Sequence, residues 1–239
     1  MRFGEKIMEN IICLCISILT IVLLKYLFKI SLKKAKELET NENLQKITDK
    51  LPENIDVAKE MLEMLGNNNV KIEEQKNTKT SLYIVISNKI LIADLKNNYS
   101  RIGTIAHECL HSVQDKTLLL FNFIFSNITI VYFLTAIVLT IFKVYTNYLL
   151  QIVILLIMGL VQFAVRGFLE TDAMTKSKFL AKDYIESKNV CTDEEINELI
   201  IEYDKINTMG ISFIIYKLLS NCLTKIIIYN IILLIIKNL

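Results

Sequence analysis

Residues 118–142 read LLLFNFIFSNITIVYFLTAIVLTIF, a run of apolar and uncharged polar residues without a single charged side chain. Because about 20 helical residues cross the hydrocarbon core of a bilayer, this run predicts a transmembrane helix. Two blocks of similar character lie at residues 8–28 and 149–168. The sequence therefore predicts three membrane spans before its C-terminal region.

The composition of the whole chain also indicates a membrane protein. Hydrophobic residues make up 53% of the 239 residues, and the mean hydropathy is +0.42, which is high for an ordinary soluble domain of this size. Residues 209–239 are apolar as well, although Lys217, Asn221 and Lys225 interrupt them. This C-terminal segment predicts one long span or a broken helix, and both remain open. We expect a mainly α integral membrane protein in the cell membrane, with the lipid bilayer as one partner.

Positive charge predicts how the spans are oriented. The flank richer in lysine and arginine faces the cytoplasm. The first block is followed by Lys29, Lys33, Lys34 and Lys36, and the end of the third block carries or is followed by Arg166, Lys176, Lys178 and Lys182. The opposite flanks carry only Arg2, Lys6 and Lys143. The segments between the first and second spans and after the third are therefore expected in the cytoplasm.

Five segments follow from this reading of the chain. They are an N-terminal anchor at 1–30, a cytoplasmic part at 31–117, two transmembrane helices at 118–168, cytoplasmic helices at 169–208 and a C-terminal transmembrane segment at 209–239. The first block lacks a small-x-small cleavage site, which favours a retained anchor over a signal peptide. The net charge of +2, without a basic tract, does not suggest a nucleic-acid partner.

The only two histidines of the chain lie four residues apart, in IAHECLH at residues 105–111. On a helix, side chains at i and i+4 project from one face roughly 6 Å apart, so His107 and His111 can bind one tetrahedral Zn²⁺ ion. Glu108 between them is placed to act on a metal-bound water as general base. Short patterns also arise by chance, but this HExxH spacing favours a zinc site.

A catalytic zinc site needs a third protein ligand. Since the chain has no other histidine, that ligand is expected to be a carboxylate or, with less support, a cysteine. Cys109 points away from the histidines on a helix, which favours a packing role for it. Two predicted spans later the chain returns to the same side at Glu170 and Asp172. Glu170 is the first candidate and Asp172 the competing one, while a helical ion pair with Arg166 is the plain alternative for Glu170.

The segment before the motif has recognisable local patterns. Residues 54–65 have helical spacing of apolar residues and end at Gly66, a typical C-cap. Residues 81–86 and 89–93 are isoleucine-rich and predict a strand pair. Ser100 is a plausible N-cap for a helix that runs to about Gln114 and carries the two histidines.

Two consequences follow for the site's surroundings. Seven residues separate His111 from Leu118, or about 10 Å along one continuous helix, so the metal is expected close to the bilayer surface on the cytoplasmic side. A strand with a free edge could bind an extended peptide, with an ordinary structural strand as the alternative.

Three short stretches, taken in order, carry a resemblance to a known family. AHECLHSVQD at 106–115, ETDA at 170–173 and TDEE at 192–195, together with the order of spans, resemble the YugP-like neutral zinc metallopeptidases of prokaryotic membranes. The resemblance covers most of the chain. Two residues depart from the family pattern: Leu110 replaces the usual glycine, and Met174 replaces a serine.

The resemblance implies a particular fold and chemistry. It implies a small α+β, gluzincin-like domain of helix, β-hairpin and HExxH helix merged with a transmembrane helix bundle. It implies one Zn²⁺ bound by His107, His111 and Glu170, with Glu108 as the catalytic residue. The expected activity is hydrolysis of peptide bonds in a peptide or membrane-protein substrate.

Several roles stay open at this point. Tyr99 or a late cytoplasmic residue could stabilise the oxyanion. Gln114 and Asp115 could orient a histidine, or simply lie solvated at a helix end. The competing function is a non-catalytic membrane scaffold or assembly factor with a structural zinc site. A transporter is a weaker alternative, because the spans carry amides rather than paired charges.

Overall fold

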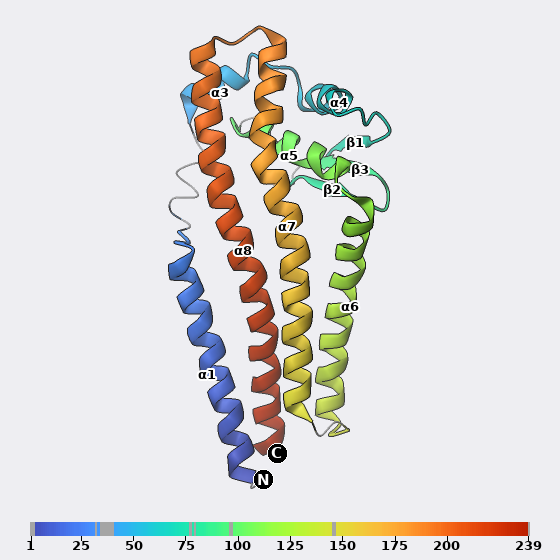
Figure 1. Ribbon diagram of the computed structural model, residues 1–239, viewed down its shortest axis with the longest axis vertical. Coiled ribbons are helices and arrows are strands. Elements are labelled where there is room, and N and C mark those ends of the chain that lie inside the picture. The colour runs from blue at the N-terminus through green and yellow to red at the C-terminus, as the bar shows by residue number, and fades with distance from the viewer. Residues whose placement is uncertain are drawn as a thin grey trace. The chain divides into compact units, whose positions relative to one another are not determined.

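Figure 1 shows the computed structural model, which describes residues 3–31, 33, 41–76, 78, 80–95, 98–144 and 147–238. The chain is mostly helical, with one small sheet of three strands. It divides into two compact units. The helical unit comprises Met1–Ile30, Phe121–Gly167 and Ser212–Leu239, and the mixed unit comprises Ser31–Leu120 and Phe168–Ile211.

Among the residues that the structure describes, four helices are long and apolar enough to cross a membrane. They are α1 (Phe3–Leu27), α6 (Lys116–Ile141), α7 (Tyr148–Lys188) and α8 (Asp193–Asn238). The three predicted spans therefore fall on helices, as expected. The C-terminal segment is one continuous helix and not a broken hairpin. Neither its lysines nor its asparagine breaks the backbone hydrogen bonding of α8.

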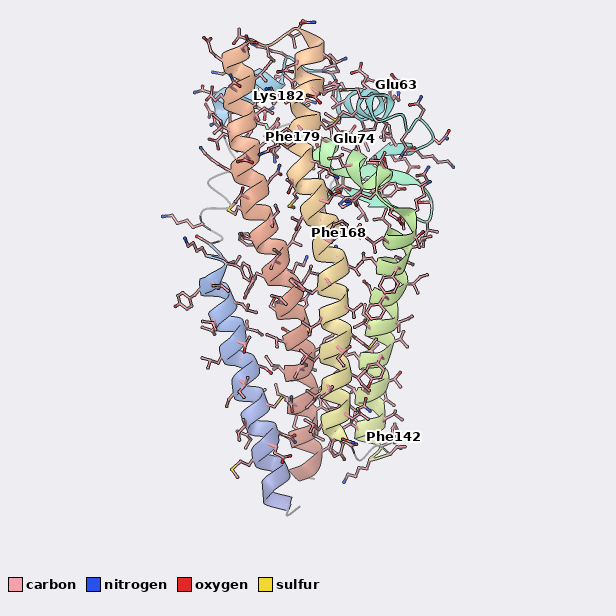
Figure 2. The ribbon with its side chains drawn as sticks, in the orientation of Figure 1. Glu63, Glu74, Phe142, Phe168, Phe179 and Lys182 are labelled. Atoms are coloured by element: carbon pink, nitrogen blue, oxygen red, sulfur yellow. The ribbon has the colours of Figure 1, made fainter. Side chains whose placement is uncertain are left out.

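Polar contacts join helices within the helical unit. The Tyr132 hydroxyl donates to Gln151 Oε1 (2.5 Å), and Gln162 Nε2 donates to Ser126 Oγ (2.9 Å). A small apolar cluster lies beside them, formed by Ala136, Ile152, Leu155, Cys222, Ile226 and Tyr229. Most apolar side chains of this unit point outwards, as the 73% exposed Phe142 does in Figure 2. These two glutamines therefore join α6 to α7, whereas Asn127 Nδ2 donates to the Phe123 carbonyl (2.8 Å) within α6.

The mixed unit contains a sheet and three short helices packed around it. Its helices are α3 (Glu42–Thr48), α4 (Asn54–Met64) and α5 (Arg101–Val113), and its strands are β1 (Lys71–Glu74), β2 (Leu82–Ile84) and β3 (Lys89–Ile92). The strand order is β1-β3-β2, with β2 antiparallel and β1 parallel to β3. Segments of α7 and α8 complete the core of this unit.

The predicted hairpin is confirmed, but β1 was not predicted. Its sequence, KIEE, has one apolar residue and no clear alternation, so only pairing with β3 reveals it. The first hairpin strand is shorter than expected because the turn begins early and passes through Asn88, whose φ is 47°. Helix α4 ends as predicted, with Gly66 at a φ of 67°, a left-handed conformation that glycine adopts without strain.

Helix α5 enters the core through its apolar face. Ile102, Ile105 and Cys109 are fully buried, which confirms the packing role expected for the cysteine. Ser100 occupies the N-cap position, but its side chain makes no capping bond and instead donates to Asn98 Oδ1 (2.8 Å). Arg101 is buried at the first turn and donates to main-chain carbonyls of Thr48, Leu51 and Pro52 and to Asn54 Oδ1.

Two helix boundaries differ from the sequence reading. Helix α7 does not end at Phe168, where the apolar stretch ends, but continues to Lys188. Its sequence contains no proline that would end the helix earlier. Helix α5 ends at Val113 and α6 begins at Lys116, so the 10 Å estimate, which assumed one continuous helix, does not apply. Helix α8 begins with the expected capping box, in which Thr192 and Glu195 exchange bonds of 3.0 and 3.3 Å.

The orientation of the spans rests on charges that the structure describes only in part. Arg2, Lys34 and Lys36 lie outside the described residues. The cytoplasmic location of the mixed unit therefore stays a prediction.

Candidate metal centre

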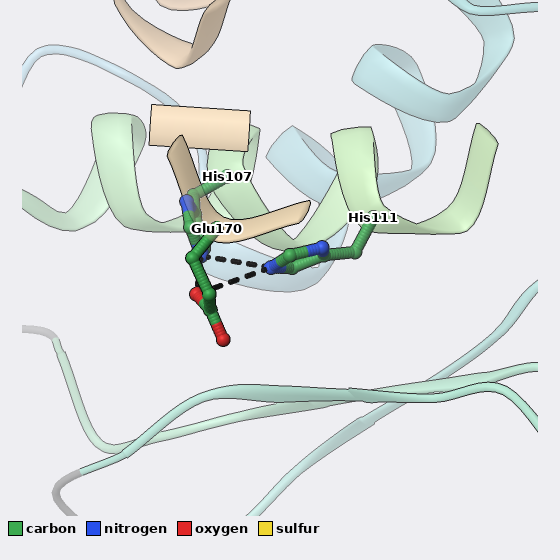
Figure 3. A group of neighbouring side chains, drawn as sticks. All are labelled: His107, His111 and Glu170. Atoms are coloured by element: carbon green, nitrogen blue, oxygen red, sulfur yellow. Dashed lines mark hydrogen bonds and ion pairs between the residues drawn. The ribbon is translucent and has the colours of Figure 1, made fainter. Parts of the chain in front are cut away.

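His107 and His111 lie on the same face of α5, one turn apart. Their Nε2 atoms are 3.0 Å from each other, and their rings meet edge to face with centroids 4.5 Å apart (Figure 3). Both side chains are largely buried, at 15% and 12% exposure. The helical i, i+4 spacing thus directs two nitrogen donors to one point.

Glu170 brings the third donor from helix α7, far away in sequence. Its Oε2 lies 3.5 Å from His107 Nε2 and 3.6 Å from His111 Nε2 (Figure 3). Around a tetrahedral metal with bonds of 2.0–2.1 Å, neighbouring donor atoms are about 3.3–3.4 Å apart. The three donor atoms therefore have nearly the spacing that one zinc-sized ion requires, and the group could hold a metal ion.

The competing carboxylate, Asp172, makes other contacts. Its Oδ1 pairs with Lys176 (2.6 Å) on the next turn of α7, and its Oδ2 accepts from Gln114 Nε2 (3.0 Å). Burial alone would raise the pKa of Asp172, but the bonds from Lys176 and Gln114 outweigh it and lower that pKa. Asp172 therefore supports the residues around the site instead of joining the donor group.

Electrostatics within the donor group favour a charged carboxylate. Burial would raise the pKa of Glu170, but the hydrogen bonds from His107 and His111 outweigh burial and hold that pKa well below its usual range. Burial would likewise lower the pKa of His111, yet Glu170 and Glu108 raise it overall. The two effects have one cause, because a buried anion facing two imidazoles attracts a positive charge.

Gln114 fixes the ring of His111. Its Nε2 donates to the Leu169 carbonyl (2.8 Å) and to Asp172, and because both partners are acceptors, the amide orientation is determined. Oε1 then faces His111 Nδ1 at 2.8 Å, so Nδ1 must carry the hydrogen. A neutral His111 therefore presents the lone pair of Nε2 to the donor group, as a metal ligand must.

Glu108 is held by the edge strand of the sheet. The residue is 6% exposed, and its Oε2 accepts the main-chain N–H of Tyr83 on β2 (2.7 Å). Burial raises the pKa of Glu108, although the neighbouring imidazoles act in the opposite direction. A carboxyl with a raised pKa, held next to a metal site, is suited to accept and return a proton.

Two further predicted residues, Asp115 and Tyr99, have structural roles, whereas the role of Tyr83 was not predicted. Asp115 is exposed and its Oδ1 accepts the Leu118 N–H (2.9 Å) at the start of α6, so it caps a helix. Tyr99 is 2% exposed, its main-chain carbonyl accepts the Tyr203 hydroxyl (2.9 Å), and it packs in the core. Tyr83 had no sequence signal, because its contribution is a main-chain donor that any residue could supply.

Comparison of the chain with models of protein families, with curated proteins and with solved structures finds no match. The resemblance to YugP-like metallopeptidases consequently rests on the sequence motifs alone. What the structure adds is a chain with four helices capable of crossing a membrane and a His107, His111 and Glu170 group that could hold a metal ion.

Proposed function

We propose that the protein is a zinc-dependent peptidase that crosses the membrane several times and is related to the YugP-like family. Its active site is proposed to lie on the cytoplasmic side. The main support for this proposal is the short distance between three donor atoms. The Nε2 atoms of His107 and His111 lie 3.0 Å apart, and Glu170 Oε2 lies 3.5 and 3.6 Å from them. Two histidines and a glutamate form a ligand set typical of catalytic zinc.

The number of protein donors favours catalysis over a purely structural site. Structural zinc sites have four protein ligands, whereas catalytic sites have three and keep one position for water or substrate. Among the residues that the structure describes, the group has three members, and Asp172 is engaged with Gln114 and Lys176. This count argues against the scaffold alternative.

Each protein group has a distinct task in the proposed reaction. The zinc ion, when bound, would polarise the scissile carbonyl and make water acidic enough to ionise near neutral pH. Glu108 takes the proton from the attacking water and gives it to the leaving amine. We assign this transfer to Oε1, because Oε2 accepts the Tyr83 N–H. Gln114 keeps His111 in the tautomer that binds metal.

The test measures metal and turnover separately. The full chain, Glu108→Gln and Glu170→Gln are purified in detergent, and zinc per protein and chelator-sensitive cleavage of casein and a peptide library are measured. Glu108→Gln should retain stoichiometric zinc and lose turnover by at least about 1000-fold. Glu170→Gln should lower the zinc affinity about 100- to 1000-fold. This loss corresponds to about a quarter of the binding free energy of a four-ligand site, because one of four ligands is removed.

Glu63→Gln is the matched control, since Glu63 is an exposed carboxylate on α4 (Figure 2). It should behave like the wild type in both measurements. Zinc in the wild type and in Glu108→Gln without cleavage by either would overturn the peptidase proposal in favour of a structural site. Absence of bound zinc in the wild type would overturn both.

A further inference from the structure

A cavity of about 160 Å³ opens directly beside His107 within the mixed unit. It is lined by the N-cap residue Ser100 and by Gly103, Thr104 and His107 of α5, by Met174 of α7, and by Tyr203, Ile206 and Asn207 of α8. His107 belongs to both the donor group and the cavity wall, so the cavity borders the candidate metal centre at this side chain. It extends from there towards the N-terminal end of α5.

The lining of the cavity is mainly apolar and firmly held. The Tyr203 ring is fixed by its hydroxyl, which donates to the Tyr99 carbonyl (2.9 Å), and Asn207 Nδ2 donates to Ser177 Oγ (3.0 Å). Apart from His107, the lining residues carry no charge. A charged group placed here would lose its hydration without gaining an opposite charge, which disfavours acidic and basic occupants.

Gly103 determines how deep the cavity is. A Cβ atom added there would lie 3.4 Å from Tyr203 Cδ2, which is ordinary contact, so alanine fits. Any longer side chain must occupy the cavity or displace the buried Tyr203 ring. Because glycine has no side chain, Gly103 leaves space in the part of the cavity that lies along α5 beyond His107.

We propose that this cavity receives the side chain of the substrate residue next to the scissile bond and selects compact apolar side chains such as leucine, methionine or phenylalanine. The inference rests on the proposed peptidase function. The size of the cavity fits such side chains, because an apolar cavity of about 150 Å³ accommodates a benzene ring. A peptide whose carbonyl lies at the donor group would have a neighbouring side chain within reach of the His107 wall.

The first test uses one fluorogenic peptide with glycine, alanine, leucine, phenylalanine, aspartate or lysine on either side of the cleaved bond. In the wild type, leucine and phenylalanine should give about 10- to 100-fold higher kcat/KM than glycine or aspartate at one of the two positions. Gly103→Leu should abolish this advantage and still cleave the glycine and alanine peptides. Loss of all cleavage together with zinc would show misfolding, so Gly103→Ala, which should only narrow the preference, is measured in parallel.

A matched pair on α8 tests the opposite change. Ile206→Ala enlarges the cavity and should shift the preference towards phenylalanine over leucine, whereas Ile201→Ala removes the same atoms from a 57% exposed position and should leave the preference unchanged. Equal shifts in both variants, or a wild type that prefers charged side chains at both positions, would overturn the proposal while leaving the peptidase function intact.

A binding measurement makes the inference independent of turnover. Hydroxamates of glycine, leucine and phenylalanine bind zinc through the same group and differ only in the side chain. The zinc-loaded Glu108→Gln variant should bind the leucine and phenylalanine compounds about 10-fold or more tightly than the glycine compound, and adding Gly103→Leu should remove the difference. Equal affinities for all three would overturn the inference. Failure to load zinc would instead overturn the proposed function.

Discussion

The mixed unit and the helical unit differ in how much apolar surface they bury and in whether they bury charged side chains. In the mixed unit, apolar residues from every element form one large cluster, and two charged residues, Arg101 and Glu108, are buried with hydrogen-bond partners. In the apolar stretches of the four long helices, only 11–28% of residues are buried. The buried polar side chains described in the helical unit are all uncharged: Asn10, Ser17, Thr129, Thr140, Gln151 and Asn230.

The difference follows from the solvent that each unit requires. A core surrounded by water gains stability by removing apolar area from it, and then has the packing to hold a few fully satisfied charges. Helices surrounded by hydrocarbon gain nothing from hiding apolar side chains, so close packing and neutral hydrogen bonds hold them together. The group of His107, His111 and Glu170, which could hold a metal ion, belongs to the unit that buries charged residues.

Arg101 tests whether buried charge organises the mixed unit. Arg101→Ala would leave the Leu51 and Pro52 carbonyls and Asn54 Oδ1 without their donor, and each orphaned acceptor costs about 1–3 kcal/mol. The Thr48 carbonyl would keep the Leu51 N–H as a donor (3.0 Å). We expect a loss of at least about 3 kcal/mol in the free energy of unfolding, measured by denaturant titration in detergent. Arg101→Lys should lose less, because it retains a donor. Wild-type stability of Arg101→Ala would break the comparison.

Gly159 tests close packing in the helical unit. A Cβ atom added at Gly159 would lie 2.0 Å from Cys222 Sγ and 2.7 Å from its Cβ, so α7 and α8 must move apart. Gly159→Ala should destabilise the protein by about 1–3 kcal/mol in a detergent unfolding assay. Gly167→Ala on the same helix meets nothing nearer than 4.0 Å and should be neutral or stabilise by up to about 1 kcal/mol. The same sign for both variants would contradict the packing argument.

Gln114 tests the hydrogen bonds that support the candidate metal centre. Gln114→Ala removes the acceptor of His111 Nδ1 and the link to Leu169, and should weaken zinc binding about 10- to 100-fold in a competition titration with a chelating dye. Asp115→Asn is the adjacent control, because Asp115 caps α6 and does not contact the histidines. Equal zinc affinity of the wild type and Gln114→Ala would show that His111 needs no orienting partner.

Glu60 gives the smallest expected effect, at the rim of the mixed unit. The bond from Lys188 lowers the pKa of Glu60, and the Tyr184 hydroxyl also donates to it (2.8 Å). Because the folded pKa is depressed, the contribution is complete above the usual carboxyl pKa of 4.5 and is lost as the pH falls below it. The carboxylate is partly exposed, so less than about 1 kcal/mol is expected.

The measurement compares unfolding of the wild type and Glu60→Gln between about pH 3 and about pH 6. The stability difference between the two proteins should shrink towards the acid end. If the difference in the free energy of unfolding does not change with pH, the charge of Glu60 does not contribute to stability.

Much of this organisation was predictable because it depends on neighbours in sequence. Uncharged runs of helical length mark the spans, the four-residue spacing of His107 and His111 directs both rings to one face, and Gly66 marks a helix end. Helical periodicity places such residues without knowledge of the rest of the chain. The count of spans made Glu170 a candidate but could not separate it from Asp172, and only the family resemblance pointed to Glu170.

The sequence by itself determined three apolar spans, a further apolar C-terminal segment and a pair of histidines at the spacing of metal ligands. The tertiary structure alone decided which carboxylate joins them, that Gln114 fixes the His111 tautomer, that Tyr83 N–H engages Glu108, and that a cavity opens beside His107. The reason is physical. Turn and span signals act over a few residues, whereas the donor group, the parallel β1 strand and the cavity arise from contacts between segments far apart in the chain, which no local pattern encodes.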